Sequence, residues 1–179
     1  MEIKEAQSIL DEFVESESLQ RHCKSVACSM RHFAPEGEKD MWYVVGLLHD
    51  FDYEKWPETH PDKGQDILRE RSLDEESVIA ILKHDDRKGP VRETAMEKTL
   101  FAVDELSGFV VAVSQVRPDK MIGMKVKSVK KKMKAKSFAA AVNRDDFLKG
   151  AGELGIELEE LIQGVIDALT ESADELGLS

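Results

Sequence analysis

Three ionisable side chains stand among apolar residues, where a charged group needs a partner. His49 and Asp50 end the run VVGLLHD, and Asp104 lies inside LFAVDELSGFVV. Moving an ionised carboxylate out of water without a partner costs several kcal/mol, unless the group becomes protonated. These residues therefore require a cation, an arginine or the wet side of a helix. At helical spacing, Gly46 and Gly108 would leave room beside them for an ion or a ligand.

Three further histidines have positions that suit metal binding. His22 lies on the apolar helix LQRHCKSVA, His60 in a proline-flanked loop, and His84 at the end of VIAILKHDD. Imidazole nitrogens and carboxylate oxygens bind divalent transition metals at about 2.0–2.2 Å. No local HExxH pair is present, so a metal site would have to combine four or five separate helices. Taken singly, each histidine is also consistent with a satisfied core or surface residue, and His32 is interpreted in that way.

The order of these residues resembles that of the HD superfamily of metal-dependent phosphohydrolases, which is named for its adjacent His-Asp pair. The resemblance covers about residues 3–116 and includes the segments LLHD, HPDKG and AILKHD. The tail from VRPDK to NRDD resembles that of a small subgroup of HD hydrolases, which indicates a chemistry but no substrate.

The resemblance implies a ligand set and a reaction. His22, His49, Asp50 and Asp104 would bind one divalent ion, and His60 and His84 would add a second, with Asp50 bridging both. The ions would be Mn, Fe, Ni, Co, Zn or Mg. A metal-activated water would then attack the phosphorus of a nucleotide or a phosphomonoester, which makes Asp50 a catalytic residue as well as a ligand.

The chain departs from the family directly after the His-Asp pair. Many members have a small residue and then a lysine near the phosphate, whereas this chain has Phe51, Asp52 and Tyr53. Asp52 could be a general acid or base near the metal, or an exposed acid in a turn. The missing cation could come from any of several residues, namely Lys55, Lys63, Arg87, Lys88 or Arg117.

The segment 117–136 is strongly basic. It holds nine Lys/Arg residues and one acid, a charge of +8 in a chain whose net charge is −11. It could be a solvated helix face. Alternatively, Arg117, Lys130 and Lys131 could fold over the metal cleft and, with Arg87, hold substrate phosphates. Nucleic acid is disfavoured as a partner, because only Phe138 is nearby to stack on a base.

Helical periodicity runs through almost the whole chain. It predicts an all-α protein of one domain, residues 1–179, in which an HD-type helical bundle (about 3–116) is followed by the basic segment (117–136) and C-terminal helices (137–179). We expect helices near 3–14, 18–30, 41–50, 62–71, 74–84, 92–114, 137–153 and 157–176.

Composition excludes several classes of protein. The content of 41% hydrophobic and 34% charged residues is that of a globular domain. The longest uncharged apolar run, 41–48, is too short to span a bilayer. Cys23 and Cys28 are badly spaced for a disulfide, and the N-terminus is charged, so we expect a cytoplasmic protein with no membrane partner.

Two alternative functions remain open at this point. One is a di-iron oxygenase on the same fold, since histidine and carboxylate ligands also suit iron. The other is a non-catalytic, metal-stabilised module whose basic segment docks an anionic partner. The oligomeric state is open as well.

Overall fold

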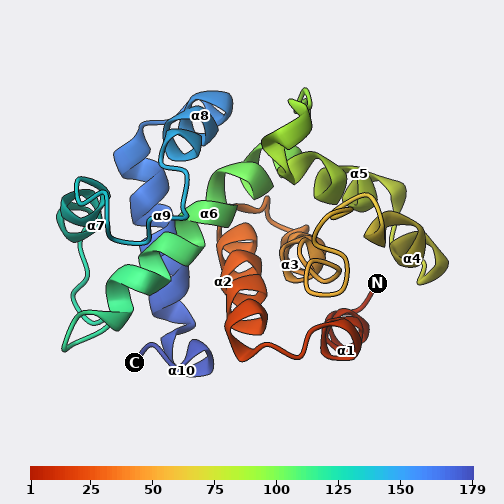
Figure 1. Cartoon of the computed structure of the whole chain (residues 1–179), viewed down its shortest axis with the longest axis horizontal. Helices are drawn as coiled ribbons and strands as arrows, with labels where there is room; N and C mark the ends of the chain where they lie inside the picture. The colour runs from red at the N-terminus through yellow and green to blue at the C-terminus, as the bar shows by residue number, and fades with distance from the viewer.

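The computed structural model describes all residues, 1–179, and its regular secondary structure is entirely helical (Figure 1). The predicted all-α class is therefore confirmed. The α-helices are α1 (Ile3–Phe13), α2 (Glu17–Phe33), α3 (Lys39–Leu48), α4 (Gly64–Glu70), α5 (Glu75–His84), α6 (Ala95–Gln115), α7 (Val126–Met133), α8 (Asp145–Leu154), α9 (Leu158–Glu171) and α10 (Ala173–Leu176). A short 3-10 helix, η1 (Asp86–Lys88), joins α5 to the loop before α6.

Three helices that later supply site residues begin at side-chain caps. The side chains of Ser16, Asp74 and Thr94 each accept a hydrogen bond from the backbone N–H three residues further on, at the starts of α2, α5 and α6. Such caps satisfy N–H groups that would otherwise lack a partner and so define where each helix begins. The starting point in turn sets which residues face inward.

One continuous core connects the two ends of the chain. In Figure 1, α2 and α6 lie in the middle, with α1, α3, α4 and α5 on one side and α7 to α10 on the other. Helix α9 packs against α2 and α6, and α8 packs against α6. Buried side chains from both ends, such as Leu10 and Val165, belong to the same apolar cluster. The C-terminal helices therefore share a core with residues 3–116. None of the helices combines the length and the apolar character needed to cross a membrane.

The sequence-based boundaries differ from the structure at two helices and are incomplete in the basic segment. The helix expected over 157–176 is divided at Ser172 into α9 and α10. The helix expected from 137 begins only at Asp145, because residues 137–144 form an irregular turn. Arg144 holds this turn by donating hydrogen bonds to the backbone oxygens of Met133 and Val142. The basic segment contains a helix of its own, α7, which buries Val129.

The expected role of Gly46 is also wrong. A Cβ atom at this position would lie 2.7 Å from Cα of Ala27, so the missing side chain lets α3 pack directly on α2. The glycine makes room for a helix contact and not for an ion.

Candidate metal centre

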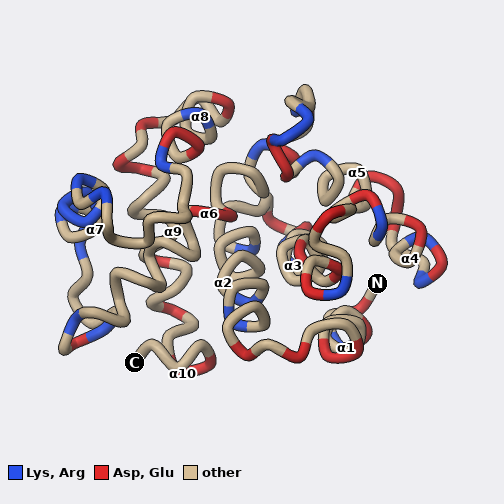
Figure 2. Tube along the Cα trace, in the orientation of Figure 1, with Lys and Arg blue, Asp and Glu red and all other residues tan.

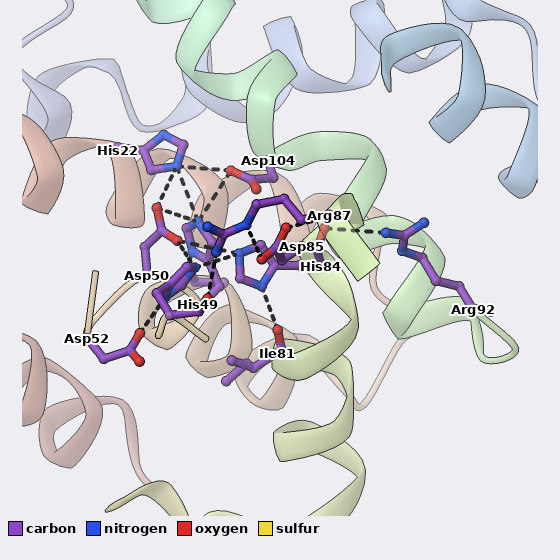
Figure 3. A network of polar contacts seen from close by, with 12 residues as sticks. His22, His49, Asp50, Asp52, Ile81, His84, Asp85, Arg87, Arg92 and Asp104 are labelled. Carbon is purple, nitrogen blue, oxygen red and sulfur yellow. Dashed lines mark hydrogen bonds and ion pairs between the residues drawn. The ribbon is translucent and has the colours of Figure 1, made fainter. Parts of the chain in front are cut away.

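Six predicted site residues converge from five parts of the fold (Figure 3). They are His22 in α2, His49 and Asp50 at the end of α3, His60 in the loop before α4, His84 as the last residue of α5, and Asp104 in α6. Short helices and loops separate them in sequence, and only the packing of α2, α3, α5 and α6 brings their polar atoms together. The structure thus assembles the proposed ligand set without HExxH or any other local ligand motif.

Four of these residues form a first group of ligand atoms. Nε2 of His22 lies 3.0 Å from Oδ1 of Asp104 and 3.2 Å from Nε2 of His49. Oδ2 of Asp50 lies 3.6 Å from the first imidazole and 3.5 Å from the second. Ligand atoms about 2.1 Å from a tetrahedral ion are roughly 3.4 Å apart, so these separations suit a single cation.

A second group forms around the other oxygen of Asp50. Oδ1 of this residue lies 3.1 Å from Nε2 of His60 and 3.4 Å from Nε2 of His84. The two imidazole nitrogens are 3.3 Å apart. Asp50 therefore presents one carboxylate oxygen to each group, as a bridging ligand must.

Hydrogen bonds orient three of the imidazoles toward the centre. Nδ1 of His49 donates to the backbone oxygen of Gly46 at 2.7 Å, and Nδ1 of His84 donates to that of Ile81 at 2.5 Å. Nδ1 of His60 donates to Oδ1 of Asp52 at 2.6 Å. A proton on Nδ1 leaves Nε2 of a neutral imidazole with its lone pair, which is the form that binds metal.

This donor set fits a divalent cation better than it fits hydrogen bonding alone. Because Nδ1 of His60 and of His84 each donate a hydrogen bond, their two unprotonated Nε2 atoms cannot bond to each other, yet these atoms face one another at 3.3 Å. A cation between them would satisfy both nitrogens and the adjacent carboxylate. Imidazole with carboxylate is the ligand combination of zinc, iron, manganese, cobalt and nickel sites.

The electrostatics show the same demand for positive charge. Burial lowers the pKa of His49, but the carboxylates of Asp50 and Asp104 outweigh it and raise this pKa to about 9. Burial raises the pKa of Asp104, but the adjacent His49 and His22 hold it far below its usual range. The two carboxylates buried beside His49 thus favour a positive charge at this place, and a metal ion would supply the same charge.

Asp52 is neither on the wall of the cleft nor in an exposed turn, the two positions expected for it. Its side chain is 1% exposed, so it is not an exposed turn acid. One oxygen accepts the hydrogen bond from His60, and the residue does not line the cleft beside the metal centre. Gly64 lies so close that a Cβ atom there would be 2.8 Å from the other oxygen of Asp52. The buried carboxylate of Asp52 thus orients the imidazole of His60.

An open cleft of about 480 Å³ leads to the centre. Its walls carry Asp50, His60, His84 and Asp104 from the centre itself. The other lining residues are Tyr53 after α3, Asp85 after α5, Asp86 and Arg87 in η1, Phe101 and Glu105 in α6, Asn143 before α8 and Asp146 in α8. The C-terminal part of the chain thus contributes to the same cleft as the ligand helices. A small molecule could reach the metal ligands from solvent through it.

Arg87 provides the cation at this cleft. Its Nη2 donates to the backbone oxygen of His60 at 2.6 Å, and its Nε donates to Oδ2 of Asp85 at 2.7 Å. These bonds hold the guanidinium beside the second group of ligands, with Nη1 left without a protein acceptor. Of the five cations considered for the missing lysine, only Arg87 lines the cleft.

The basic segment lies elsewhere, and the prediction that it covers the cleft is wrong. Figure 2 shows its Lys and Arg residues gathered on and around α7, which packs on α9 and α6. Lys130 pairs with Glu159, Lys131 is exposed, and Arg117 donates to the backbone oxygens of Lys120 and Ile122. None of the three lines the cleft. Because Val129 is the residue that α7 buries, the lysines remain on the solvent side of the helix.

Arg92 was not identified from the sequence. Its buried guanidinium donates to the backbone oxygen of Lys83 at 2.8 Å and to Asp86 at 3.0 Å, and it stacks 3.6 Å from the ring centre of Phe101. These contacts tie the end of α5, where His84 lies, to η1 and α6. A single arginine in a polar loop carries no sequence signal for such a role.

Two acids of the cleft were also missed. Glu105 and Asp146 form no ion pair, unlike Asp85 and Asp86. Burial and the adjacent Asp104 raise the pKa of Glu105 to about 7, and burial and Asp86 raise that of Asp146. Both carboxyl groups line the same cleft as Arg87.

Comparison with known proteins adds nothing to this geometry. The chain matches no family model, no curated protein and no solved structure. The case for a function therefore depends on the arrangement of the residues themselves.

Proposed function

We propose that the protein is an HD-type, metal-dependent phosphohydrolase that hydrolyses a small phosphomonoester. The observation that carries the proposal is the placing of the Asp50 carboxylate in an open cleft. One of its oxygens faces one group of imidazoles and the other oxygen faces the second group. His22, His49, Asp50 and Asp104 would hold one divalent ion, and Asp50, His60 and His84 the other.

The residues of the chain then have distinct tasks. Bound divalent ions supply a water of lowered pKa and neutralise charge on phosphoryl oxygens. Arg87 donates from Nη1 to a phosphoryl oxygen of the substrate, since its other nitrogens are held by Asp85 and His60. Asp52 keeps the proton on Nδ1 of His60, so that Nε2 stays available as a ligand.

The charge of the cleft favours a monoester over a polyphosphate. Arg87 is its only Lys or Arg, and Asp85 already pairs with it. With no second Lys or Arg in the cleft, further phosphate groups would lack a cationic partner. The expected substrate is therefore a phosphomonoester, including a nucleoside monophosphate, and not a nucleoside triphosphate.

The test is phosphate release by the purified protein after removal of metal and reloading with Mn²⁺, Co²⁺, Ni²⁺ or Mg²⁺. A panel of phosphomonoesters, nucleoside monophosphates and nucleoside triphosphates would be compared, with Asp50→Asn as the inactive control and Asp119→Asn as the matched exposed control. We expect release from monoesters by the parent and by the exposed variant. Bound metal with no release from any substrate would contradict the proposal, and oxygen consumption by an iron-loaded form would favour an oxygenase instead.

A further inference from the structure

One imidazole of the centre lacks the outer hydrogen bond that the other three have. His49, His60 and His84 each donate Nδ1–H to an acceptor within the protein. Nδ1 of His22 forms no such bond, and Figure 3 shows this nitrogen pointing away from the cluster. Its side chain is 23% exposed, so the nitrogen is accessible from outside the centre.

A separate pocket of about 180 Å³ opens beside His22. Helices α2 and α6 line it through Ser18, Arg21, His22, Gly108, Val111, Ala112 and Gln115. A Cβ atom at Gly108 would lie 3.3 Å from Nδ1 of His22. The absence of a side chain at residue 108 thus keeps space open directly next to this nitrogen.

The chemistry of this pocket is opposite to that of the metal cleft. No carboxylate lines it, whereas several line the cleft. The side chain of Arg21 forms no ion pair and no hydrogen bond within the protein. Arg21 also lines a neighbouring groove, which Glu17 and Glu175 border. The guanidinium of Arg21, the hydroxyl of Ser18 and the amide of Gln115 can all donate hydrogen bonds.

We propose that this pocket binds a small oxyanion, a carboxylate or a phosphate, which strengthens metal binding from behind His22. One oxygen would accept the hydrogen bond from Nδ1 of His22, and another would accept from Arg21. The anion would then supply what Gly46, Asp52 and Ile81 supply to the other imidazoles. The inference rests on the metal centre proposed above and adds a second ligand that regulates it.

The expected size of the effect follows from known metal sites. Removing an outer hydrogen-bond partner from a histidine ligand typically weakens metal binding by about 10–100-fold. Filling the pocket should therefore tighten metal binding by about tenfold. Because the pocket and the cleft share no lining residue, the anion would not compete with a substrate in the cleft.

Anion binding can be measured without any metal. The imidazole nitrogens of metal-free protein labelled with 15N-histidine would be followed by NMR during titration with sodium acetate, and separately with inorganic phosphate, at constant ionic strength. We expect a saturable shift at Nδ1 of His22 in the parent and in Lys24→Ala, which changes a neighbouring cation outside the pocket. Arg21→Ala should lose the shift, and a response to acetate alone would identify the anion as a carboxylate.

A second variant tests the pocket independently of Arg21→Ala. Gly108→Ala would place a methyl group beside Nδ1 of His22 and should abolish the acetate response while Arg21 remains. Normal helix content by circular dichroism would show that each variant folds. No shift in the parent, or an equal shift in the parent, Arg21→Ala and Gly108→Ala, would overturn the inference.

Metal affinity completes the test. The Kd for Mn²⁺, measured by calorimetry with and without acetate, should fall about tenfold in the parent and in Lys24→Ala, and remain unchanged in Arg21→Ala. An acetate shift without a change in Kd would overturn the coupling. An acetate shift in a protein that binds no divalent metal would contradict the proposed hydrolase and leave the anion pocket intact.

Discussion

Oδ1 of Asp50 lies 3.1 Å from Nε2 of His60, while Oδ2 of the same carboxylate faces His22 and His49. Asp50 is therefore the one residue shared by both groups of ligand atoms.

Loss of Asp50 should have a different effect on metal content from loss of a histidine in one group. We expect Asp50→Asn to lose both ions, because its charge and both oxygens serve two sites. His60→Ala should lose one ion and keep the other. Elemental analysis of metal per protein chain checks this, and equal metal content in parent and His60→Ala would contradict a second site.

Asp52→Asn should weaken the second site without emptying the first. Without its charge, Asp52 no longer holds the proton on Nδ1 of His60. Removing the hydrogen-bond partner of a histidine ligand typically lowers metal affinity by about 10–100-fold. We therefore expect a metal titration to show a loss of affinity of that size for one of the two ions. Asp119→Asn, an exposed change, serves as the control. A uniform loss at both sites would instead indicate that Asp52 supports the whole loop.

Arg87→Ala should impair the substrate step and leave the metal in place. A hydrogen bond to a charged group is worth about 2 kcal/mol, which corresponds to roughly a 30-fold fall in kcat/KM for a phosphomonoester. Arg87→Lys should recover part of this loss. Lys88→Ala changes the adjacent cation, which does not line the cleft and should leave kcat/KM unchanged. A large fall in metal content in Arg87→Ala would contradict a role toward substrate.

The stability of metal-free protein should fall as the pH rises from about 6.5 to 9. Burial lowers the pKa of His49 and His60, but the carboxylates near them outweigh burial and raise each pKa to about 9. Histidine in an unfolded chain has a pKa near 6.5. A raised pKa in the folded state stabilises it fully below about pH 6.5, and this contribution is lost as the pH passes about 9.

Metal should reverse this trend, because ligand histidines bind metal in their neutral form. Thermal unfolding in the presence of EDTA or of Mn²⁺ would therefore show a difference in Tm that grows with pH. A Tm of the EDTA-treated protein that stays constant across this window would contradict the arrangement of charges at the centre.

Much of the helical fold was predictable from local sequence. The apolar spacing predicted a helix near 74–84, and the structure has α5 at Glu75–His84. The helix predicted over 137–144 is absent. Arg144 holds this segment as a turn by hydrogen bonds to backbone oxygens, and the spacing of apolar residues gives no sign of such bonds. Cys23 and Cys28 form no disulfide, as their spacing indicated, and both are buried.

The sequence by itself determined the all-α class and the candidate ligands, since helical periodicity and ionisable residues in apolar runs are local properties. Only the tertiary structure decided that Asp52 orients His60, that Arg87 lines the cleft and that Lys130 does not. Those roles depend on which surfaces of distant helices pack together. Packing is set by the sum of many contacts across the whole core, and no short stretch of sequence records that sum.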